Sequence, residues 1–523
     1  PGRIEVIGNH LDHQGGPVIA ASVNLDAVAS VSRNTENKIR IYYSVKNEFS
    51  TNNKANYEDD YLEIDLNDPR AVEIQEVSAI MSEDEKKRIQ SLNLVRGLLK
   101  AFQEENLYEE KAAFAVGGFD LCINSEVPLG SGLSSSAAIA MLYSKILNDL
   151  YNGGVLDLLS MAKCCQRAEH IAWGKKVGLL DPPACGKGGS TYFDFYDRLH
   201  PEIVTLPGLY ETLLADNYRF VIVDTRHNPN RPDECLDHSD LKEEYNEIRC
   251  SMTKVAIALK LIPFEKLMKK AFDNLETDDF VKDLHEKILK LIEAGDLQGL
   301  EAMLLVGLSE LKRYSDGGPQ LYLTALERCL NEIKRIGNPE DLRLADLGLT
   351  EEMFNSYIGI LSSRENIQDL DVLRAMHFFS EKARVQELAE RAFHGKLTSD
   401  FILAAIRASG DSSEDRLQNV SLPSSKQKPV AIALQITKLM FGDTSSSGAQ
   451  RIHGGGFAGV ILVLLKERRI EALTEVLTGK EGETGRFPKG AVMPVNIRRL
   501  GTVNVNAEVE SLINSDTQSG SKK

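Results

Sequence analysis

Apolar and polar positions along this chain follow two periods, and the changes of period mark the expected elements. Short apolar or alternating runs predict strands at 18–31, 42–65, 119–123, 218–224 and 460–465. Apolar residues spaced three and four apart predict helices at 84–103, 137–151 and 156–173. Strands and helices are therefore both expected in the first third of the chain, and a buried strand is expected in its last third.

The interval from Leu261 to Asp369 has a different character, because its pattern is almost wholly that of amphipathic helices. It contains no loop rich in both serine and glycine and no cluster of metal-ligating residue types. The pattern predicts an all-helical insertion, 261–369, that serves packing or an oligomer contact and lies away from the functional site. It leaves the oligomeric state open.

The stretch from Pro128 to Ala140 joins a predicted strand to a predicted helix through two glycines and a run of serines. Gly130 and Gly132 allow a sharp turn and the close approach of a ligand. Ser134 to Ser136 are able to cap the helix, whose first N–H groups have no partner of their own. Such a helix end binds phosphate well. The alternative is an ordinary serine-capped helix after a glycine turn.

The first residues of the chain form a second polar turn, because an alternating strand leads into Asn9, His10, Asp12 and His13 with glycines on both sides. Together with Arg3, these side chains make a site for a hydroxyl-rich ligand plausible. The chain begins at Pro1 without a methionine, inside this motif, which suggests a truncated N-terminus.

Composition narrows the class of protein. The 523 residues are 42% hydrophobic and 26% charged, as in a soluble globular protein of two or three domains. A formal net charge of −16 argues against nucleic acid as a partner. Seven irregularly spaced cysteines indicate a reducing, cytoplasmic location. Since no apolar run approaches the roughly 18 residues of a membrane span, no membrane partner is expected.

Three motifs resemble those of the GHMP kinases, the superfamily of galactokinase, homoserine, mevalonate and phosphomevalonate kinases. Gly130 to Ala138 is similar to their central ATP-phosphate motif, and no Walker lysine follows its glycines. Arg3, His10 and Asp12 match the galactokinase signature, although Asn9 replaces the family's glutamate. Residues 451–459 resemble the third motif, with Ala458 where galactokinases often have glycine. Weaker likenesses occur at 93–97, 244–246 and 374–381.

This resemblance implies an α+β fold of two lobes, with a ribosomal S5 domain 2-like N-terminal lobe and an α/β C-terminal lobe. We expect residues 1–215 to form the first lobe and residues 216–260 and 370–510 to form the second. The helical insertion would separate the two parts of the second lobe. A polar tail, 511–523, is expected to be disordered.

The resemblance also implies roles for individual residues. Asp181 would be the catalytic base, and the cationic Arg3 would keep it ionised. Asn9, His10 and Asp12 would bind sugar hydroxyls. Ser136 and Glu169 would hold the Mg²⁺ that accompanies ATP. The ATP-binding set comprises Gly130, Ser131, Gly132, Leu133, Ser134, Ser135, Ser136, Ala137, Gly455 and Gly456.

Each of these acidic residues also has a simpler interpretation. Asp181 precedes two prolines that would stop a helix, and aspartate commonly starts a turn. The family's glutamine after this aspartate is replaced by Pro182. Glu169 would be an ordinary glutamate on a helix surface.

Three functions remain open at this point. The first is an ATP-dependent kinase that phosphorylates the anomeric C1 hydroxyl of galactose or a related sugar. The second is a galacturonate 1-kinase, because that family's first motif also reads as His10 to Gly16 does here, and Asn9 would not repel a C6 carboxylate. The third is a catalytically silent sugar sensor on the same scaffold. Homoserine and mevalonate kinases lack the signature that runs from Arg3 to Asp12.

Overall fold

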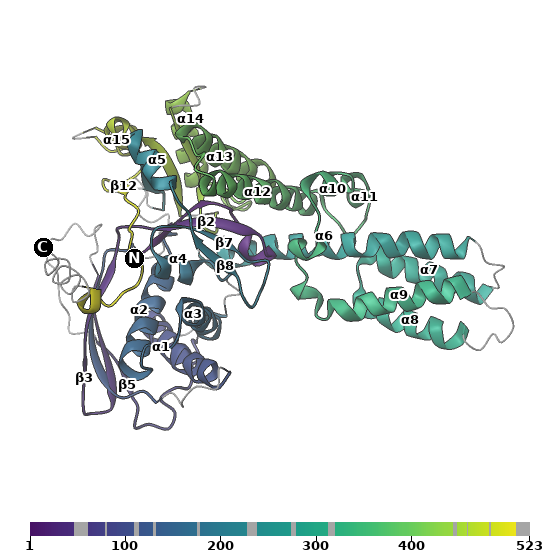
Figure 1. Ribbon diagram of the computed structural model, residues 1–523, viewed down its shortest axis with the longest axis horizontal. Helices are drawn as coiled ribbons and strands as arrows, with labels where there is room; N and C mark the ends of the chain where they lie inside the picture. Colours follow the sequence, from purple (N-terminus) through teal and green to yellow (C-terminus); the bar gives the residue numbers. More distant parts are fainter. Residues whose placement is uncertain are drawn as a thin grey trace, which may run out of the picture.

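The computed structural model describes most of the chain as two lobes and a projecting helical arm (Figure 1). The described residues are 1–45, 61–78, 81–108, 115–128, 132–174, 178–226, 238–273, 279–311, 320–442, 447–457, 459–480 and 483–508. The tail predicted at 511–523 lies outside them. Helices and sheets occur together in each lobe, so the fold is α+β as predicted.

The N-terminal lobe contains two four-stranded sheets. The first has the order β1-β2-β7-β8 and is antiparallel, whereas the second, β3-β6-β4-β5, contains one parallel pair, β4 and β6. The strands are β1 Arg3–Ile7, β2 Pro17–Ser22, β3 Ala27–Arg33, β4 Lys38–Val45, β5 Tyr61–Asp65, β6 Phe119–Ser125, β7 Ser190–Asp194 and β8 Glu202–Thr205. The single strand predicted at 18–31 is therefore two strands in different sheets, because the polar segment 24–26 interrupts the pattern.

Four helices pack in this lobe: α1 Glu83–Tyr108, α2 Ser135–Tyr151, α3 Leu158–Trp173 and α4 Asp181–Lys187. Helices α1 and α3 pack closely at Gly97, where a Cβ atom would lie 3.0 Å from the backbone of Ala168. Helix α4 corrects one prediction, because Pro182 and Pro183 begin a helix instead of stopping one. Proline costs nothing in the first turn, where its missing N–H would have no helical partner.

The C-terminal lobe is built on the antiparallel sheet β10-β11-β9-β12. Its strands are β9 Tyr218–Asp224, β10 Gly448–His453, β11 Val460–Lys466 and β12 Val492–Val495, and its helices are α5 Leu209–Ala215, α12 Asp369–Phe393, α13 Ser399–Ser412, α14 Pro429–Phe441 and α15 Ile470–Thr478. Strand β11 is covered on both faces: Ile461 and Val463 pack in a core with α14 and α15, while Leu462 and Leu464 join the main core. Burial on both faces explains the uninterrupted apolar run at 460–465.

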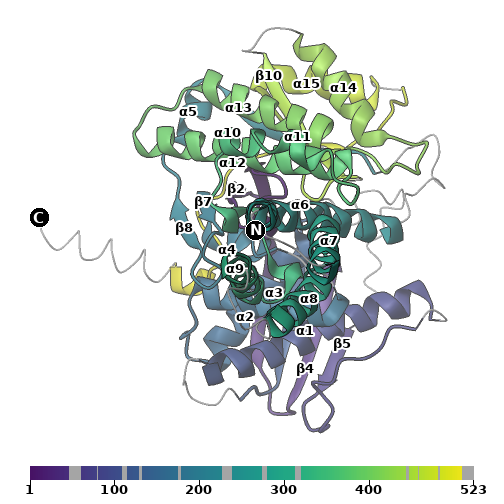
Figure 2. The same cartoon turned by 90° about the vertical axis from the view of Figure 1, so that its right-hand side faces the viewer.

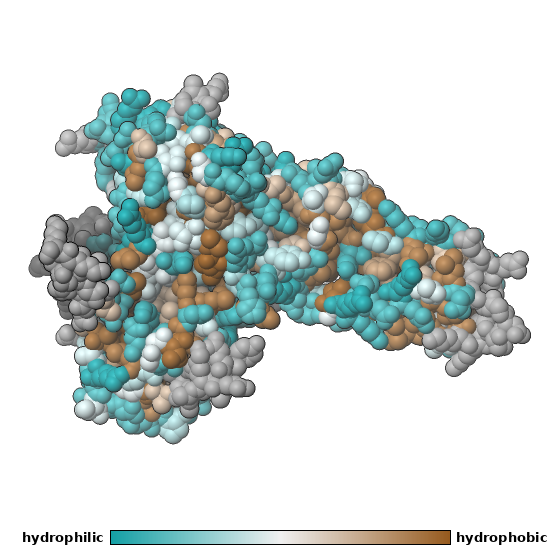
Figure 3. Space-filling view, in the orientation of Figure 1, coloured by the Kyte–Doolittle hydropathy of each residue, from teal (hydrophilic) through white to brown (hydrophobic). Residues whose placement is uncertain are grey.

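The arm projects away from both lobes (Figures 1 and 2). It is formed by the second half of α6 His238–Phe272 together with α7 Asp279–Ala294, α8 Leu297–Leu311 and α9 Gln320–Ile336, which share a hydrophobic core of their own. Within the predicted helical interval, α7 and α8 are separated at Gly295, whose φ of +69° ends α7. Apolar and polar patches alternate on the face of the arm seen in Figure 3.

The segment after the arm returns to the lobes and does not belong to the arm core. Its short elements are η2 Pro339–Asp341, η3 Leu344–Leu347, α10 Glu351–Asn355 and α11 Ile358–Leu361, and their apolar side chains join the main core. The N–H of Leu344 donates to Gln14 Oε1 at 3.0 Å. The predicted insertion 261–369 thus includes an arm and a segment that packs against the first motif.

The end of the described chain returns to the N-terminal lobe. Val23 and Ile497 form an antiparallel bridge, and the N–H of Gly189 donates to the carbonyl of Arg498 at 2.7 Å. The N–H of Thr502 donates to the carbonyl of Gly186 at 3.1 Å. Residues 496–502 therefore complete the edge of the lobe that begins the chain. Among the described residues, no helix combines the length and apolarity that crossing a membrane requires.

Candidate active site

Arg3 and Asp181 form an ion pair at the centre of the predicted site. The Arg3 Nε and Nη2 atoms donate to Asp181 Oδ1 at 2.9 and 2.7 Å, and Nη1 donates to the carbonyl of Gly132 at 2.5 Å. Burial alone would lower the pKa of Arg3, but the charges of Asp181 and Glu5 raise it above its usual value. Because Arg3 holds both the predicted base and the predicted phosphate loop, it joins the two motifs.

The predicted phosphate loop is described from Gly132 onward, and Gly130 and Ser131 lie outside the described residues. Helix α2 begins at Ser135, but no side chain caps it, contrary to the capping role predicted for the serines. Ser134 has left-handed backbone geometry, with a φ of 56°, and its hydroxyl donates to Asp181 Oδ2 at 2.5 Å. The loop is fixed to β1, since the N–H of Arg3 donates to the carbonyl of Leu133 at 3.1 Å. Ser136 and Ala137 lie in the first turn of α2.

Asp12 lies in the 3₁₀ turn Asp12–Gln14 that follows β1. Burial, together with the nearby charges of Asp181 and Glu5, raises its pKa to about 7. Only glycine fits at position 178, because a Cβ atom there would lie 1.6 Å from Asp12 Oδ2. Asp12 and Asp181 therefore face the same part of the site.

Tyr245 on α6 belongs to this site. The sequence analysis noted only a likeness to the family at 244–246 and assigned no role to this residue. Its ring lies 4.9 Å from the ring of His10, centroid to centroid. Burial and the charges of Asp12 and Asp181 raise the pKa of its hydroxyl well above the usual value. Tyr245 therefore lies in the same charged environment as Asp12 and Asp181.

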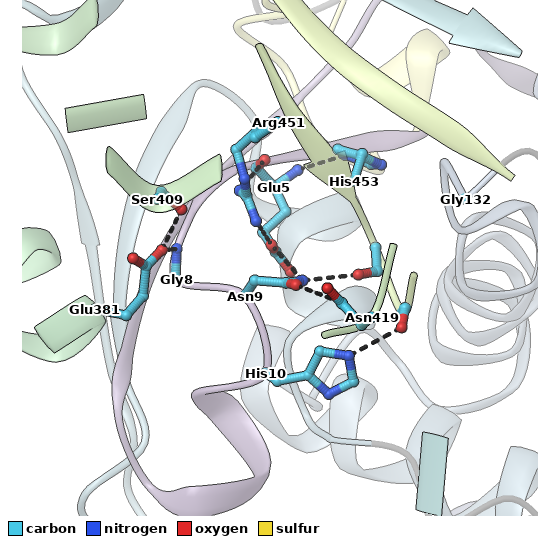
Figure 4. A network of polar contacts seen from close by, with 12 residues as sticks. Glu5, Gly8, Asn9, His10, Gly132, Glu381, Ser409, Asn419, Arg451 and His453 are labelled. Atoms are coloured by element: carbon cyan, nitrogen blue, oxygen red, sulfur yellow. Dashed lines mark hydrogen bonds and ion pairs between the residues drawn. The ribbon is translucent and has the colours of Figure 1, made fainter. Parts of the chain in front are cut away.

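Asn9 and His10 are buried and make their hydrogen bonds inside the protein. Asn9 Nδ2 donates to the Gly454 carbonyl at 2.7 Å and to Glu5 Oε1 at 3.0 Å (Figure 4). His10 Nε2 lies 3.0 Å from the Gly455 carbonyl, and burial lowers the pKa of His10 to about 3. A neutral His10 therefore donates to the Gly455 carbonyl. The side chains of Asn9 and His10 thus connect the first motif to the third through hydrogen bonds.

A carboxylate does lie beside Asn9, but it belongs to Glu5. Arg451 Nη2 donates to Glu5 Oε1 at 2.7 Å, and Asn419 donates to Asn9 Oδ1 at 2.8 Å. This arrangement explains the departure at position 9, because the pair of Glu5 and Arg451 occupies the interior next to it. The sequence could not reveal it, since the partners lie more than 400 residues apart.

Helix α12 also contacts the backbone of the first motif, at Gly8 and Asn9. His377 Nε2 lies 2.9 Å from the carbonyl of Asn9. Glu381 Oε1 accepts from the N–H of Gly8 at 3.0 Å (Figure 4). Burial would raise the pKa of Glu381, but Arg384 and its other partners lower it to about 2. Glu381 is therefore a fixed anion that holds the backbone of the first motif. The likeness at 374–381 had indicated this helix without giving it a role.

The third motif packs against the phosphate loop. A Cβ atom on Gly454 would lie 3.6 Å from the carbonyl oxygen of Gly132. Gly455 lies against Tyr245, where a Cβ atom would approach the ring to 3.0 Å, and a Cβ atom on Gly456 would lie 2.4 Å from the carbonyl oxygen of Asn419. The three motifs thus meet in one place.

Glu169 lies on α3 and is buried, with 5% of its surface exposed, so the exposed-surface interpretation is wrong. Burial chiefly raises the pKa of Cys185 on α4 to about 12, and the charges of Asp181 and Glu169 add to this effect. Helices α2, α3 and α4 pack on one another, which brings Ser136, Glu169 and Asp181 onto adjacent elements. Hydroxyl and carboxylate oxygens are the ligands that Mg²⁺ prefers.

Comparisons with known proteins agree with this geometry. The family model of the GHMP kinases N terminal domain matches residues 93–189, which include the phosphate loop, Glu169 and Asp181. The galactokinase galactose-binding signature matches residues 1–33. The chain thus resembles the galactokinases of the GHMP kinase superfamily in both of these segments.

Curated members of the galactokinase family align with much of the chain. The galactokinase of Streptomyces coelicolor is 28% identical over 330 residues, which cover 60% of this chain and 73% of that protein. The galactokinase of Lactobacillus helveticus is 34% identical over 239 residues, covering 45% of this chain and 54% of that protein. The crystal structure of Lactococcus lactis galactokinase complexed with galactose matches with a TM-score of 0.54 and 18% identity, covering 96% of this chain and 92% of that chain. This last likeness supports the shared fold.

Proposed function

We propose that the protein transfers the γ-phosphoryl group of ATP to the anomeric C1 hydroxyl of galactose or a closely related sugar. The observation that carries the proposal is the contact of Arg3 with both Asp181 and the Gly132 carbonyl, because it joins a candidate base to a phosphate loop. The relatives named galactokinase support the same activity.

In the proposed reaction Asp181 accepts the proton of the C1 hydroxyl while the sugar oxygen forms a bond to the γ-phosphorus. The bond from that phosphorus to the β–γ bridging oxygen breaks, and ADP leaves. Arg3 provides a fixed positive charge beside the reacting groups, where it stabilises charge on the phosphoryl group. Ser134 fixes the orientation of the Asp181 carboxylate.

Backbone N–H groups in the first turn of α2 have no partner within the helix, so they suit the phosphates of the nucleotide. Ser136 and Glu169 would hold Mg²⁺, which neutralises phosphate charge when it is bound. The oxygen-donor character of both side chains and the burial of Glu169 fit that ion.

On the sugar side, Asp12 and Tyr245 would hydrogen-bond hydroxyl groups. Asn9 and His10 would support this part of the site through their hydrogen bonds to the backbone of Gly454 and Gly455. Both amide hydrogens of Asn9 are used inside the protein, and its oxygen accepts from Asn419, so we expect Asn9 to support the sugar site from within the protein. In its ionised form Asp12 adds a negative charge to this part of the site, and this charge disfavours the anionic galacturonate. The names of the relatives also favour the neutral sugar.

An ADP-release assay over a panel of hexoses and hexuronic acids tests the proposal. We expect ADP release that requires galactose or a close relative, with galacturonate much poorer. Turnover confined to hexuronic acids would favour the galacturonate kinase. Sugar and ATP binding without ADP release would favour the silent sensor.

The raised pKa of Asp12 predicts a pH dependence of sugar affinity. Its carboxylate accepts hydroxyl hydrogens, and as pH falls through about 7 the carboxylate of the sugar-free protein becomes protonated. We expect KM for the sugar to rise below pH 7, by up to roughly tenfold per pH unit, because one pKa unit corresponds to that factor. Measurement of KM from pH 5.5 to 8.5 checks this, with Asp12→Asn as the variant that should lose the dependence. A parent KM that is constant with pH contradicts the prediction.

The metal assignment predicts the behaviour of Glu169→Gln and Ser136→Ala, since each change weakens one oxygen ligand. We expect both variants to need roughly 10- to 100-fold more Mg²⁺ for half-maximal rate, a typical cost of disturbing a metal site. Glu104→Gln, a matched change of an exposed glutamate on α1, should leave the Mg²⁺ requirement unchanged. Unaltered ATP kinetics at limiting Mg²⁺ would remove both residues from the metal site.

A further inference from the structure

His453, the last residue of β10, is buried beside the phosphate loop with 2% of its surface exposed. The backbone N–H of Glu5 donates to its Nε2 atom at 2.8 Å. A nitrogen that accepts a hydrogen bond carries no hydrogen, so in the neutral ring the hydrogen lies on Nδ1. The contact with β1 therefore makes Nδ1 a donor.

This Nδ1 donor has no hydrogen-bond partner among the described residues. It lies on the side of the ring that faces the loop, 3.6 Å from the position that a Cβ atom on Gly132 would take. Figure 4 shows the ring between Glu5 and Gly132. Buried donors in folded proteins nearly always have a partner, so an unsatisfied one beside a binding loop indicates a missing acceptor.

The surroundings of His453 are positively charged. Burial lowers its pKa well below the usual value, and the nearby cations Arg3 and Arg451 lower it further. The ring therefore remains neutral and keeps the tautomer that Glu5 imposes. An uncharged donor next to the Arg3 guanidinium suits an anionic oxygen as its acceptor.

We propose that His453 Nδ1 donates a hydrogen bond to a phosphate oxygen of the bound nucleotide, at the end nearest Asp181. The proposal rests on the proposed kinase function and adds a catalytic residue to it. Arg3 contacts both Gly132 and Asp181, and His453 Nδ1 lies 3.6 Å from the position that a Cβ atom on Gly132 would take, so the donor lies close to the proposed point of transfer. His453 would fix this oxygen without adding a charge.

Two substitutions at position 453 distinguish the contribution of Nδ1 from that of Nε2. The terminal amide of glutamine reaches the position of Nε2, so His453→Gln keeps an acceptor for the N–H of Glu5 and loses the donor toward the loop. The shorter asparagine places its amide near Nδ1, so His453→Asn keeps the donor and loses the contact with Glu5. His285→Gln changes a buried histidine in the arm and serves as the matched control.

We expect His453→Gln to lower kcat by about 10- to 100-fold, within the range for one lost donor to a charged group. Its Tm and its affinity for the sugar alone should match the parent. His453→Asn should have a lower Tm but a kcat nearer the parent's than the Gln variant's. This opposite order of Tm and kcat would not arise from a purely structural role. His285→Gln should retain the parent's kcat.

A His453→Gln enzyme with the parent's kcat, or a kcat that falls in step with Tm in both variants, overturns the proposal. Calorimetric titration with Mg·ATP separates this failure from failure of the kinase function. If the parent releases no ADP with any sugar, the kinase proposal fails, and the contact is then judged by ATP affinity alone. Weaker ATP binding by His453→Gln would support the contact, and equal affinity would overturn it.

Discussion

Asp181→Asn is expected to lower kcat by about 10²- to 10⁴-fold, the usual contribution of a general base. The amide keeps the size of the carboxylate but neither accepts the sugar proton nor pairs with the Arg3 charge. Affinity for the sugar should survive because Asp12 and Tyr245 remain. Steady-state kinetics and sugar titration of the same sample measure both effects. Asp149→Asn, a matched change in α2 away from the site, should leave kcat unchanged.

The ion pair adds a second measurement to this prediction. Arg3→Ala should also slow turnover, because Arg3 orients Asp181 and the Gly132 carbonyl. If the two side chains act as a unit, the double variant loses less than the product of the two single effects. An Asp181→Asn enzyme with near-normal kcat would show that the base lies elsewhere. Strictly multiplicative losses would show that the two residues act independently.

Arg451→Met is expected to have the largest effect on stability. Arg451 is fully buried, and the Glu5 carboxylate it contacts is 6% exposed. Removing the cation leaves a buried, uncompensated carboxylate, which costs about 3–5 kcal/mol. Denaturant unfolding of the variant measures the loss. Lys287→Met breaks the exposed pair with Asp283 on α7 and should cost less than about 1 kcal/mol.

A double variant decides whether the loss comes from the unpaired charge. Glu5→Gln combined with Arg451→Met removes both charges, so it should be more stable than Arg451→Met alone. An Arg451→Met protein that unfolds with the parent would contradict this account. A double variant no better than Arg451→Met would assign the loss to packing of the arginine stem.

The sequence predicted the features that depend on neighbours along the chain. The period of apolar residues located α1, α2 and α3, and the run at 460–465 located the central strand of the C-terminal lobe. The match of Arg3 and Asp181 to family positions predicted an ion pair that the structure contains. The helices and the strand rest on local periodicity, whereas the pair of Arg3 and Asp181 joins segments 178 residues apart and was predicted from the family resemblance.

The remaining features depend on contacts between distant segments. Ser134 had a satisfactory local role as a helix cap, and only the position of Asp181, 47 residues later, shows why its hydroxyl turns away. His453 looked like a residue before a glycine turn, yet its tautomer is set by Glu5 at the other end of the chain. Tyr245 lies on a long amphipathic helix, where an aromatic side chain is more often part of a core.

The return of residues 496–502 to the first lobe bears on how the protein is made. During synthesis the strands β1, β2 and β7 emerge early, but the backbone groups of Gly186 and Gly189 obtain their partners only when Arg498 and Thr502 have left the ribosome. Domains usually fold in the order of their synthesis, with the N-terminal one first. In this chain the N-terminal lobe cannot finish folding before the C-terminal segment has been made, because it cannot complete these hydrogen bonds until residues 496–502 have been synthesised.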